Sequence, residues 1–374
     1  REGKVVVTQP RRMAARAAAR RLAHLTGTKV GEQVGYTVRG DRKTSDATKV
    51  EFVTTGILLR RLISNPDATG IATIVLDEVH ERQLDTDLTF AMVQQLGELR
   101  GTADPLDIVV MSATLDAEFW VGLLTTDGAE PAQTLSVEAV TYPLREHWAP
   151  LPGTQRALDA RGVTNQFLQH IVQTVIKTVD DEPDGDVLVF LPGAREIDRV
   201  AQQLTGATPC EVLPLLGSTP AAEQDRILSP PTSRRTRRIV LATNVAESAL
   251  TVSGVRIVVD AGLDRQPRLD TGRGVAGLVT VGAAKSAMVQ RAGRAAREAP
   301  GLVVRCLSDA EFAARPAHRP AEVRTADLTQ AVLDLASWGA ADGSGLKLPE
   351  PLPARAFNAA VDGLTQLGAV ERTG

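Results

Sequence analysis

The adjacent carboxylates of Asp77 and Glu78 are the first feature of the sequence that could do chemistry. They directly follow the apolar run 71–76, and His80 comes two residues later. Carboxylates at the end of a buried strand cost free energy unless they meet a cation or take part in proton transfer. Asp77 could hold Mg²⁺ directly or through water, and Glu78 could orient and deprotonate an attacking water. An Asp-Glu pair by itself more often caps a helix, and its position after an apolar strand makes the two interpretations about equally good.

Two hydroxyl residues, Ser112 and Thr114, follow another apolar run, 108–111. If both runs are neighbouring strands, these hydroxyls could hydrogen-bond the acid pair or His80. The alternative interpretation is an ordinary Ser/Thr cap of the next helix.

A cluster of arginines near the end of the chain could bind an anion. Arg291, Arg294 and Arg297 recur every three residues, which predicts that they share one helical face. Like charges there repel, so they need an anionic partner. A triphosphate would serve, with the arginines acting as arginine fingers on the transferring phosphoryl group. Gln290 could position the water or bond His80. The alternative is a solvated helix paired with acids.

Strand-length apolar runs alternate with helical segments and must position these groups. Their lack of polar alternation predicts parallel strands covered by helices on both faces, in open α/β sheets. In such sheets the chemistry collects at the carboxyl ends of the strands. The predicted strands are Val5–Val7, Ile71–Leu76, Ile108–Met111, Val187–Leu191, Ile239–Ala242, Val255–Val259 and Leu302–Val304.

Length and charge narrow the class of protein. A chain of 374 residues predicts two to three domains. Its net charge of -3 excludes a globally basic protein, yet residues 1–61 carry 14 Lys and Arg against 5 Asp and Glu, which predicts a local basic face. Two cysteines, Cys210 and Cys306, exclude a disulfide framework and favour the cytoplasm. No apolar run is long enough to predict a membrane span. Because it starts at Arg1 in an apolar stretch, we expect the chain to be part of a longer protein.

Together, these motifs resemble those of superfamily 2 helicases of the DEAH-box type, most closely the bacterial HrpB-type group. They occur in the family order along essentially the whole chain, which makes the set far more specific than any one motif. Asp77–His80 reads Asp-Glu-Val-His, with Val where the name-giving sequence has Ala. The matching segments are Thr8–Ala15, Thr54–Arg60, Asp77–His80, Ser112–Thr114, Phe190–Gly193, Ala242–Thr251 and Gln290–Arg297.

The resemblance implies an α/β fold of two RecA-like domains with mostly parallel sheets. We expect a truncated N-terminal domain at 1–145, a C-terminal RecA-like domain at 146–315, and the start of a small helical, winged-helix-like module at 316–374. In the family, ATP binds with Mg²⁺ in the cleft between the two domains. Hydrolysis then drives 3′-to-5′ movement along single-stranded nucleic acid, usually RNA. The resemblance therefore predicts an ATP-dependent RNA helicase.

The resemblance also assigns roles to individual residues. Asp77 coordinates magnesium, Glu78 is the catalytic base, and His80 and Gln290 couple the domains across the nucleotide. Ser112 and Thr114 link hydrolysis to strand separation, and Arg294 and Arg297 are the arginine fingers. Arg21 is the candidate for stacking on the base, opposite Leu228, where relatives have an aromatic residue. The positions that match contacts to the nucleic-acid backbone are Arg11, Arg12, Arg39, Thr54, Gly193, Arg195, Thr243 and Asn244.

The sequence departs from the family pattern in three further places. The phosphate-binding loop that precedes Thr8–Ala15 in the family is absent, so we expect the 374 residues alone to hydrolyse ATP very poorly. Ala296 stands where relatives have Gly, which matters only if its φ is positive. Glu247-Ser248-Ala249 replaces the usual Glu-Thr-Ser. A non-catalytic nucleic-acid-binding relic is the alternative, and Arg265–Val281 resembles the family's strand-separating hairpin or an ordinary surface hairpin.

Overall fold

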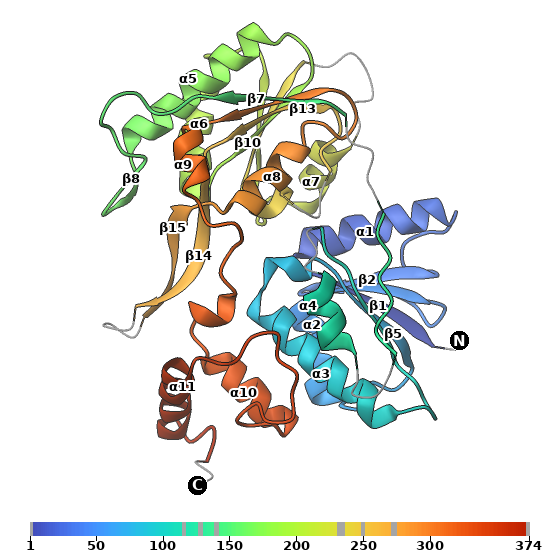
Figure 1. Ribbon diagram of the computed structural model, residues 1–374. Coiled ribbons are helices and arrows are strands. Elements are labelled where there is room, and N and C mark those ends of the chain that lie inside the picture. Colours follow the sequence, from blue (N-terminus) through green and yellow to red (C-terminus); the bar gives the residue numbers. More distant parts are fainter. Residues whose placement is uncertain are drawn as a thin grey trace. The chain divides into compact units, whose positions relative to one another are not determined.

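Two sheets of mostly parallel strands organise the chain, which is described here by a computed structural model (Figure 1). The coordinates divide into two units, each with its own core. Unit 1 comprises Arg1–Val137, Pro267–Gly277 and Pro320–Gly374, and unit 2 comprises Glu138–Gln266 and Leu278–Arg319. The structure describes residues 3–113, 117–125, 130–137, 142–229, 236–247, 251–270 and 275–371.

The sheet of unit 1 has the strand order β3-β2-β4-β1-β5-β6. All its neighbouring strands are parallel except β2 and β3. The strands are β1 (Lys4–Gln9), β2 (Val34–Val38), β3 (Asp41–Lys43), β4 (Val50–Thr54), β5 (Ile71–Leu76) and β6 (Asp107–Val110). The helices are α1 (Arg12–Leu25), α2 (Thr55–Ser64), α3 (Leu84–Arg100) and α4 (Ala117–Leu124), with the 3₁₀ turn η1 (Val79–Glu81) before α3.

Helices cover both faces of this sheet, which explains why its inner strands β1 and β5 consist mainly of apolar residues, whereas the edge strand β3 reads Asp-Arg-Lys. The alanines of α1 at a spacing of four, Ala15, Ala19 and Ala23, pack on one face. On the other face Leu58 of α2 and Phe90 of α3 are fully buried against the sheet. Small and aliphatic side chains therefore build a core in a chain that has only 3% aromatic residues.

The sheet of unit 2 is entirely parallel and has the order β11-β12-β10-β13-β16-β7. Helices α5 and α6 cover one face, where Phe167 and Ile171 pack against Val187 and Val189. The strands are β7 (Leu144–Trp148), β10 (Asp186–Phe190), β11 (Glu211–Leu215), β12 (Arg238–Ala242), β13 (Val255–Asp260) and β16 (Gly301–Arg305). The helices are α5 (Asn165–Asp181), α6 (Ala194–Leu204), α7 (Ala221–Leu228), α8 (Lys285–Gly293) and α9 (Asp309–Ala313), and the short pieces are β8 (Leu158–Asp159), β9 (Gly162–Val163) and η2 (Asn244–Ala246).

A separate two-stranded sheet, β14 (Leu263–Asp270) and β15 (Val275–Gly282), forms at the position of the predicted hairpin. It leaves unit 2, and its far end, Pro267–Gly277, groups with unit 1. There the amide of Leu269 donates to the carbonyl of Thr325 at 2.9 Å.

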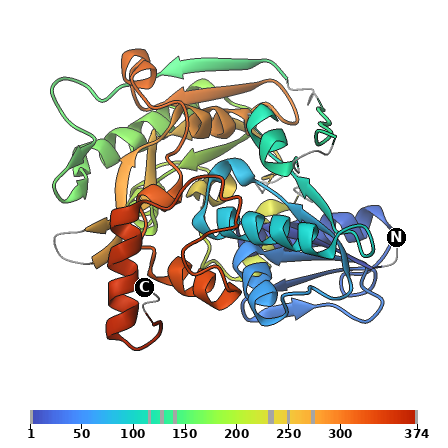
Figure 2. The ribbon, with the colours of Figure 1, turned by 60° about the horizontal axis from the view of Figure 1, so that its bottom comes forward.

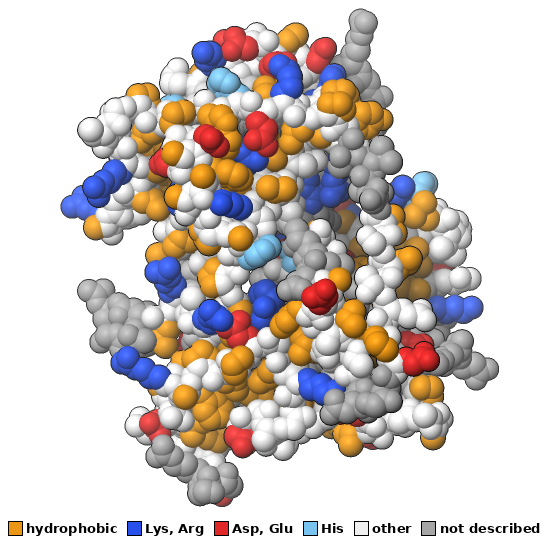
Figure 3. All heavy atoms as spheres, in the orientation of Figure 1, with side chains coloured by type: hydrophobic (Ala, Val, Ile, Leu, Met, Phe, Trp, Pro, Cys, Tyr) orange, Lys and Arg blue, Asp and Glu red, His pale blue; other side chains and the backbone are white. Residues whose placement is uncertain are grey.

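The last part of the chain adds η3 (Glu322–Arg324), α10 (Thr329–Trp338) and α11 (Ala354–Gln366) to unit 1. α10 packs beside α3, where Ala331 and Leu335 join its core and the Trp338 indole donates to Gln95 Oε1 at 2.7 Å (Figure 1). α11 is the last helix before the C-terminus (Figure 2). Apolar side chains gather on the surface over α10 and α11 (Figure 3).

The α/β fold with two mostly parallel sheets is confirmed, and all seven predicted strands form. The strands that the apolar runs missed in unit 2, β7 and β11, are the two edges of its sheet, and β11 contains Pro214. Edge strands tolerate proline and need fewer apolar residues. In the described part of the chain no helix is long and apolar enough to cross a membrane.

Candidate functional site

The carboxylate of Asp77 lies at the carboxyl end of β5 and is held from two sides. Gln9, the last residue of the neighbouring strand β1, donates from Nε2 to Asp77 Oδ2 at 2.6 Å. The amide of Glu78 donates to Asp77 Oδ1 at 2.8 Å. Burial raises the pKa of Asp77 above its ordinary value, although the bond from Gln9 acts in the opposite direction. A partly desolvated carboxylate of this kind gains from a nearby cation.

Glu78 adopts a left-handed backbone conformation, with φ of 56°. This conformation costs a non-glycine residue of order 1 kcal/mol. It carries the carboxylate back toward His80, whose Nε2 lies 3.4 Å from Glu78 Oε2. The strain therefore accompanies the close approach of the acid and the imidazole.

His80 is also bound to the end of β6. The amide of Ala113 donates to His80 Nδ1 at 3.3 Å, which leaves the ring proton on Nε2, facing Glu78. The backbone of Ala113 thus connects the residues directly after β6 to His80. Ser112 is half-buried beside it, and Thr114 lies outside the described residues.

Arg11 is engaged by Glu81. Its guanidinium donates two bonds to the buried Glu81 carboxylate, at 2.7 and 3.0 Å. Gln83 Nε2 donates to the same carboxylate at 2.8 Å. This bidentate pair anchors the turn after Glu78, and a contact of Arg11 with nucleic acid stays a prediction.

The strand order of unit 1 separates two groups of predicted residues along one edge. Arg39 follows β2, Thr54 ends β4, and Arg12 lies just beyond β1, so they occupy the β2-β4-β1 half of the edge. Asp77 and Ser112 follow β5 and β6, the other half. Arg12 and Arg39 are exposed, and Thr54 is half-buried.

In unit 2 the predicted backbone-binding residues also meet at one edge. Gly193 and Arg195 follow β10, and Thr243 and Asn244 follow β12, which is the adjacent parallel strand. A Cβ at Gly193 would lie 2.8 Å from Glu196 Oε2 and 3.0 Å from Arg265 Nη1, so a larger residue would displace these side chains. Arg195 is exposed at the start of α6.

The three arginines differ in burial, although each of them bonds Glu247 or Thr251. The α-helix α8 ends at Gly293, after Arg291, and tighter backbone bonds such as Arg294 N to Arg291 O continue the chain. Arg291 is 2% exposed, Arg294 is 6% exposed, and Arg297 is exposed. Burial therefore gives the three cations different environments.

Arg291 is enclosed by carboxylates. Its Nε donates to Glu247 Oε2 at 2.8 Å and its Nη1 to Asp260 Oδ1 at 3.1 Å, with Asp264 Oδ1 3.7 Å from Nη2. Arg319 completes the group through bonds to Glu247 at 2.8 Å and to Asp264 at 2.7 Å. Burial disfavours the charge of Glu247, but the guanidinium groups of Arg291 and Arg319 outweigh it and hold its pKa below the ordinary value.

Arg294 and Arg297 bind Glu247 and Thr251, within the family-like segment Ala242–Thr251. Arg294 Nε donates to the backbone carbonyl of Glu247 at 2.6 Å, and Arg297 Nη1 donates to Thr251 Oγ1 at 2.8 Å. Thr251 thus has a structural partner. Ala296 is not among the described residues with positive φ, so the replacement of the family's glycine brings no backbone strain.

Gln290 is half-buried on α8, and Arg21 is exposed on α1. Leu228 is the last residue of α7. Ser248 lies outside the described residues.

Sequence and structural relatives point to one family. Residues 167–299 match the helicase conserved C-terminal domain. The ATP-dependent RNA helicase HrpB of Escherichia coli K12 is 34% identical over 372 residues, which cover 99% of this chain and 44% of that protein. The probable ATP-dependent RNA helicase DHR2 of Saccharomyces cerevisiae is 33% identical over 384 residues, which cover 100% of this chain and 50% of that protein. The crystal structure of the E. coli DEAH/RHA helicase HrpB matches with a TM-score of 0.86 and 32% identity, covering 99% of this chain and 45% of that chain.

The chain belongs to the HrpB-type DEAH-box helicases. Its two parallel sheets are the RecA-like folds that the motif order predicted. The chain spans about half the length of the curated relatives it matches.

Sequence reasoning missed several residues that hold the predicted site residues in place, in unit 1 and in unit 2. Gln9 was seen only as part of the motif after β1, although its place at the end of a strand parallel to β5 puts it beside Asp77. Glu81 and Gln83 follow the motif as ordinary polar residues. Asp260 and Arg319 carry no local signal, because their roles depend on contacts with Arg291 and Glu247 far along the chain.

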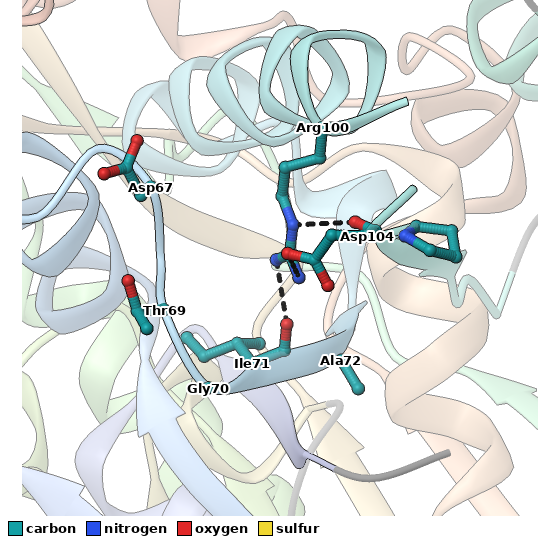
Figure 4. A pocket seen from close by; sticks show the side chains of 8 residues that line it. Asp67, Thr69, Gly70, Ile71, Ala72, Arg100 and Asp104 are labelled. Carbon is teal, nitrogen blue, oxygen red and sulfur yellow. Dashed lines mark hydrogen bonds and ion pairs between the residues drawn. The ribbon is translucent and has the colours of Figure 1, made fainter. Parts of the chain in front are cut away.

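A pocket lies at the start of β5, the end of the strand opposite to Asp77–His80 (Figure 4). It is lined by Ile71, the first residue of β5, and by Arg100. Arg100 donates to the carbonyls of Ile71 and Asp104, and its Nη2 lies 2.6 Å from the Asp104 carboxylate. Because this ion pair neutralises the cation, we assign no ligand to the pocket.

Proposed function

We propose that this protein is an ATP-dependent RNA helicase, which hydrolyses ATP with Mg²⁺ and moves 3′-to-5′ along single-stranded RNA. The observation that carries the proposal is the arrangement at the carboxyl edge of the unit 1 sheet. Asp77, Glu78 and His80 are joined there to β1 and β6 by Gln9 and Ala113. The names of the relatives, ATP-dependent RNA helicases, supply the substrate classes.

The donor set around Asp77 suits magnesium. Among the described residues no three His, Cys, Asp or Glu side chains gather as a metal cage. Magnesium does not need one, because it takes one or two carboxylates and completes its shell with phosphate oxygens and water. Asp77 would hold the ion, which when bound neutralises charge on the phosphates.

The other residues of this protein orient groups and move protons. Glu78 accepts the proton of the attacking water, and the Nε2 proton of His80 holds the Glu78 carboxylate in position. Gln9 keeps Asp77 Oδ2 directed along the strand edge. Arg294 and Arg297 are our candidates for stabilising the charge on the transferring phosphoryl group. Gln290, Ser112 and Thr114 remain predicted coupling residues, and Arg21 remains the predicted contact to the base.

RNA would be held by its phosphates and not by its bases. In each unit, exposed or half-buried basic and hydroxyl side chains lie at the carboxyl edge of the sheet, as Arg12, Arg39 and Thr54 do in unit 1. Phosphate contacts give affinity without sequence information, and the affinity falls with salt.

One prediction concerns this RNA contact. Replacing Arg39 with Ala should weaken the binding of single-stranded RNA by a few-fold for all sequences tested, and should reduce the salt slope of log K by about 0.7, as expected for one lost phosphate contact. The measurement is fluorescence anisotropy with two unrelated oligonucleotides over a series of salt concentrations. Lys49→Ala is the matched control, because Lys49 is also exposed but precedes β4 at the opposite edge. Equal losses in both variants would argue against a defined RNA edge.

A second prediction concerns the phosphate-binding loop. Residues 1–374 contain no Gly-rich loop ending in Lys-Ser or Lys-Thr. β6 is the last strand in the order of its sheet, and Val109 and Met111, which alternate along its end, are 43% and 40% exposed.

We therefore expect the 374-residue chain to hydrolyse ATP very poorly, whereas the complete protein encoded by its gene turns over ATP and is stimulated by RNA. A malachite-green assay on both proteins, with and without RNA, makes the comparison. Robust turnover by the 374-residue chain would contradict the first expectation. An inactive complete protein that still binds RNA would favour the alternative, a non-catalytic nucleic-acid-binding relic.

A further inference from the structure

The turn that follows Asp77 and Glu78 is conformationally strained at both ends. Glu78 has φ of 56° and Arg82 has φ of 51°, and the 3₁₀ turn η1 lies between them. Left-handed conformations of non-glycine residues persist only where surrounding contacts hold them. Gln9 and Ala113 bond Asp77 and His80, so other contacts must hold Arg82 at the second end of the turn.

A residue far along the chain provides these contacts. The amide of Glu322 donates to the carbonyl of Arg82 at 2.9 Å, and the amide of Leu84 donates to Glu322 Oε2 at 2.8 Å. Glu322 therefore binds the backbone on both sides of Gln83 with its own amide and carboxylate.

The carboxylate of Glu322 also completes the start of α3. Gln83, the residue before this helix, makes no side-chain capping bond. The first amides of a helix have no partner within it, and a negative charge there is favoured by the helix dipole. Glu322 supplies both the acceptor and the charge that α3 does not supply for itself.

The side chain of Arg82 is held by the same part of the chain. Its Nη2 lies 3.2 Å from Asp87 Oδ2 on α3 and 3.5 Å from Glu350 Oε2. Glu350 also pairs with Arg324, which belongs to the same turn, η3, as Glu322. Backbone and side-chain contacts thus fix Arg82 from one direction.

The turn η3 is tied to two further motifs. Thr325, the residue after η3, accepts the bond from Leu269 of β14. Arg319, shortly before η3, donates to the carboxylate of Glu247, which belongs to the family-like segment Ala242–Thr251 in unit 2. Only Pro320 and Ala321 separate Arg319 from Glu322, so the two anchors are joined by a short piece of chain.

We propose that Glu322 is a positioning residue for hydrolysis, which holds the Asp77–Arg82 turn in its active conformation and links this turn to β14 and to Glu247. The inference rests on the proposed function. Glu322 does not touch the reacting groups; it acts through Arg82 and Leu84.

The test compares Glu322→Ala with Glu322→Gln in the complete protein. Alanine removes the acceptor for Leu84, whereas the glutamine carboxamide can still accept that bond. We expect Glu322→Ala to lower kcat for RNA-stimulated ATP hydrolysis by about ten- to hundredfold, the effect of misplacing a catalytic group by a fraction of an ångström to 1 Å. KM for ATP should change less than about threefold, and Glu322→Gln should restore most of the rate.

The matched control is Glu311→Ala. Glu311 also accepts a backbone bond at a helix start, from Ser308 at 2.8 Å, but it belongs to α9 in unit 2. It should leave kcat unchanged. A normal rate in Glu322→Ala would overturn the proposal, as would equal losses in the alanine and glutamine variants.

Hydrogen exchange separates this proposal from the proposed function. In the 374-residue chain, Glu322→Ala should speed exchange in the peptide spanning residues 78–84 while the centre of α3 keeps its protection. If the wild-type complete protein does not hydrolyse ATP, the proposed function fails and this measurement alone decides the positioning role. Unchanged exchange in residues 78–84 would overturn that role even in an active enzyme.

Discussion

Replacing Glu78 with Gln should abolish RNA-stimulated ATP hydrolysis while ATP binding remains. The carboxamide has nearly the same size as the carboxylate, so the left-handed turn can form as before. Its backbone amide still donates to Asp77 Oδ1, and the bond from Gln9 is untouched. What is lost is the group that accepts a proton from water, which is worth about 10²- to 10⁴-fold in rate.

The measurement is single-turnover hydrolysis by the complete protein, with ATP affinity determined separately by a fluorescent analogue. Glu118→Gln is the matched control, because Glu118 is an exposed carboxylate on α4 of the same unit. A variant that binds ATP normally and turns over at the wild-type rate would remove Glu78 from the role of base. A variant that loses binding as well would show that the carboxylate is needed for the ground state.

The carboxyl edges of the sheets could be predicted because their signal is local. An apolar run such as Ile71–Leu76 ends in two acids, and parallel strands bring such ends together. This reasoning predicted that the strands before Asp77 and Ser112 are neighbours, and β5 and β6 do pair. The observed bond to His80 comes from the backbone amide of Ala113. Because a backbone amide is present whatever the side chain, the residue type at position 113 gives no signal for this bond.

The partners of the arginines could not be predicted, because spacing describes a helix face and not what covers it. Arg291 and Arg297 look equivalent in sequence. Glu247 reaches Arg291 from one segment and Asp260 and Asp264 reach it from another, so their convergence exists only in the folded unit. The same limit applies to Glu322, whose partner Leu84 lies in a helix of a distant segment.

This difference between the arginines leads to the second large prediction. Replacing Arg291 with Met should destabilise the 374-residue chain by about 3–5 kcal/mol, because it removes the cation from a buried group of carboxylates and leaves them uncompensated. Replacing Arg297 with Met should change the free energy of unfolding by no more than about 0.5 kcal/mol, since its side chain is exposed and loses one bond to Thr251. Urea unfolding of both variants, followed by circular dichroism, measures the contrast.

In the complete protein Arg297, whose replacement hardly changes the stability, should have a large effect on ATP hydrolysis. Arg297→Met should fold normally and lose about 10³-fold in ATP hydrolysis, the contribution expected of an arginine finger. Arg297→Lys tests geometry, because it keeps the charge but not the planar, two-pronged donor. If Arg297→Met hydrolyses ATP normally, its bond to Thr251 is its whole role. If Arg291→Met is as stable as the wild type, Arg319 alone suffices to neutralise Glu247, and the cation at Arg291 was not required to keep that carboxylate charged.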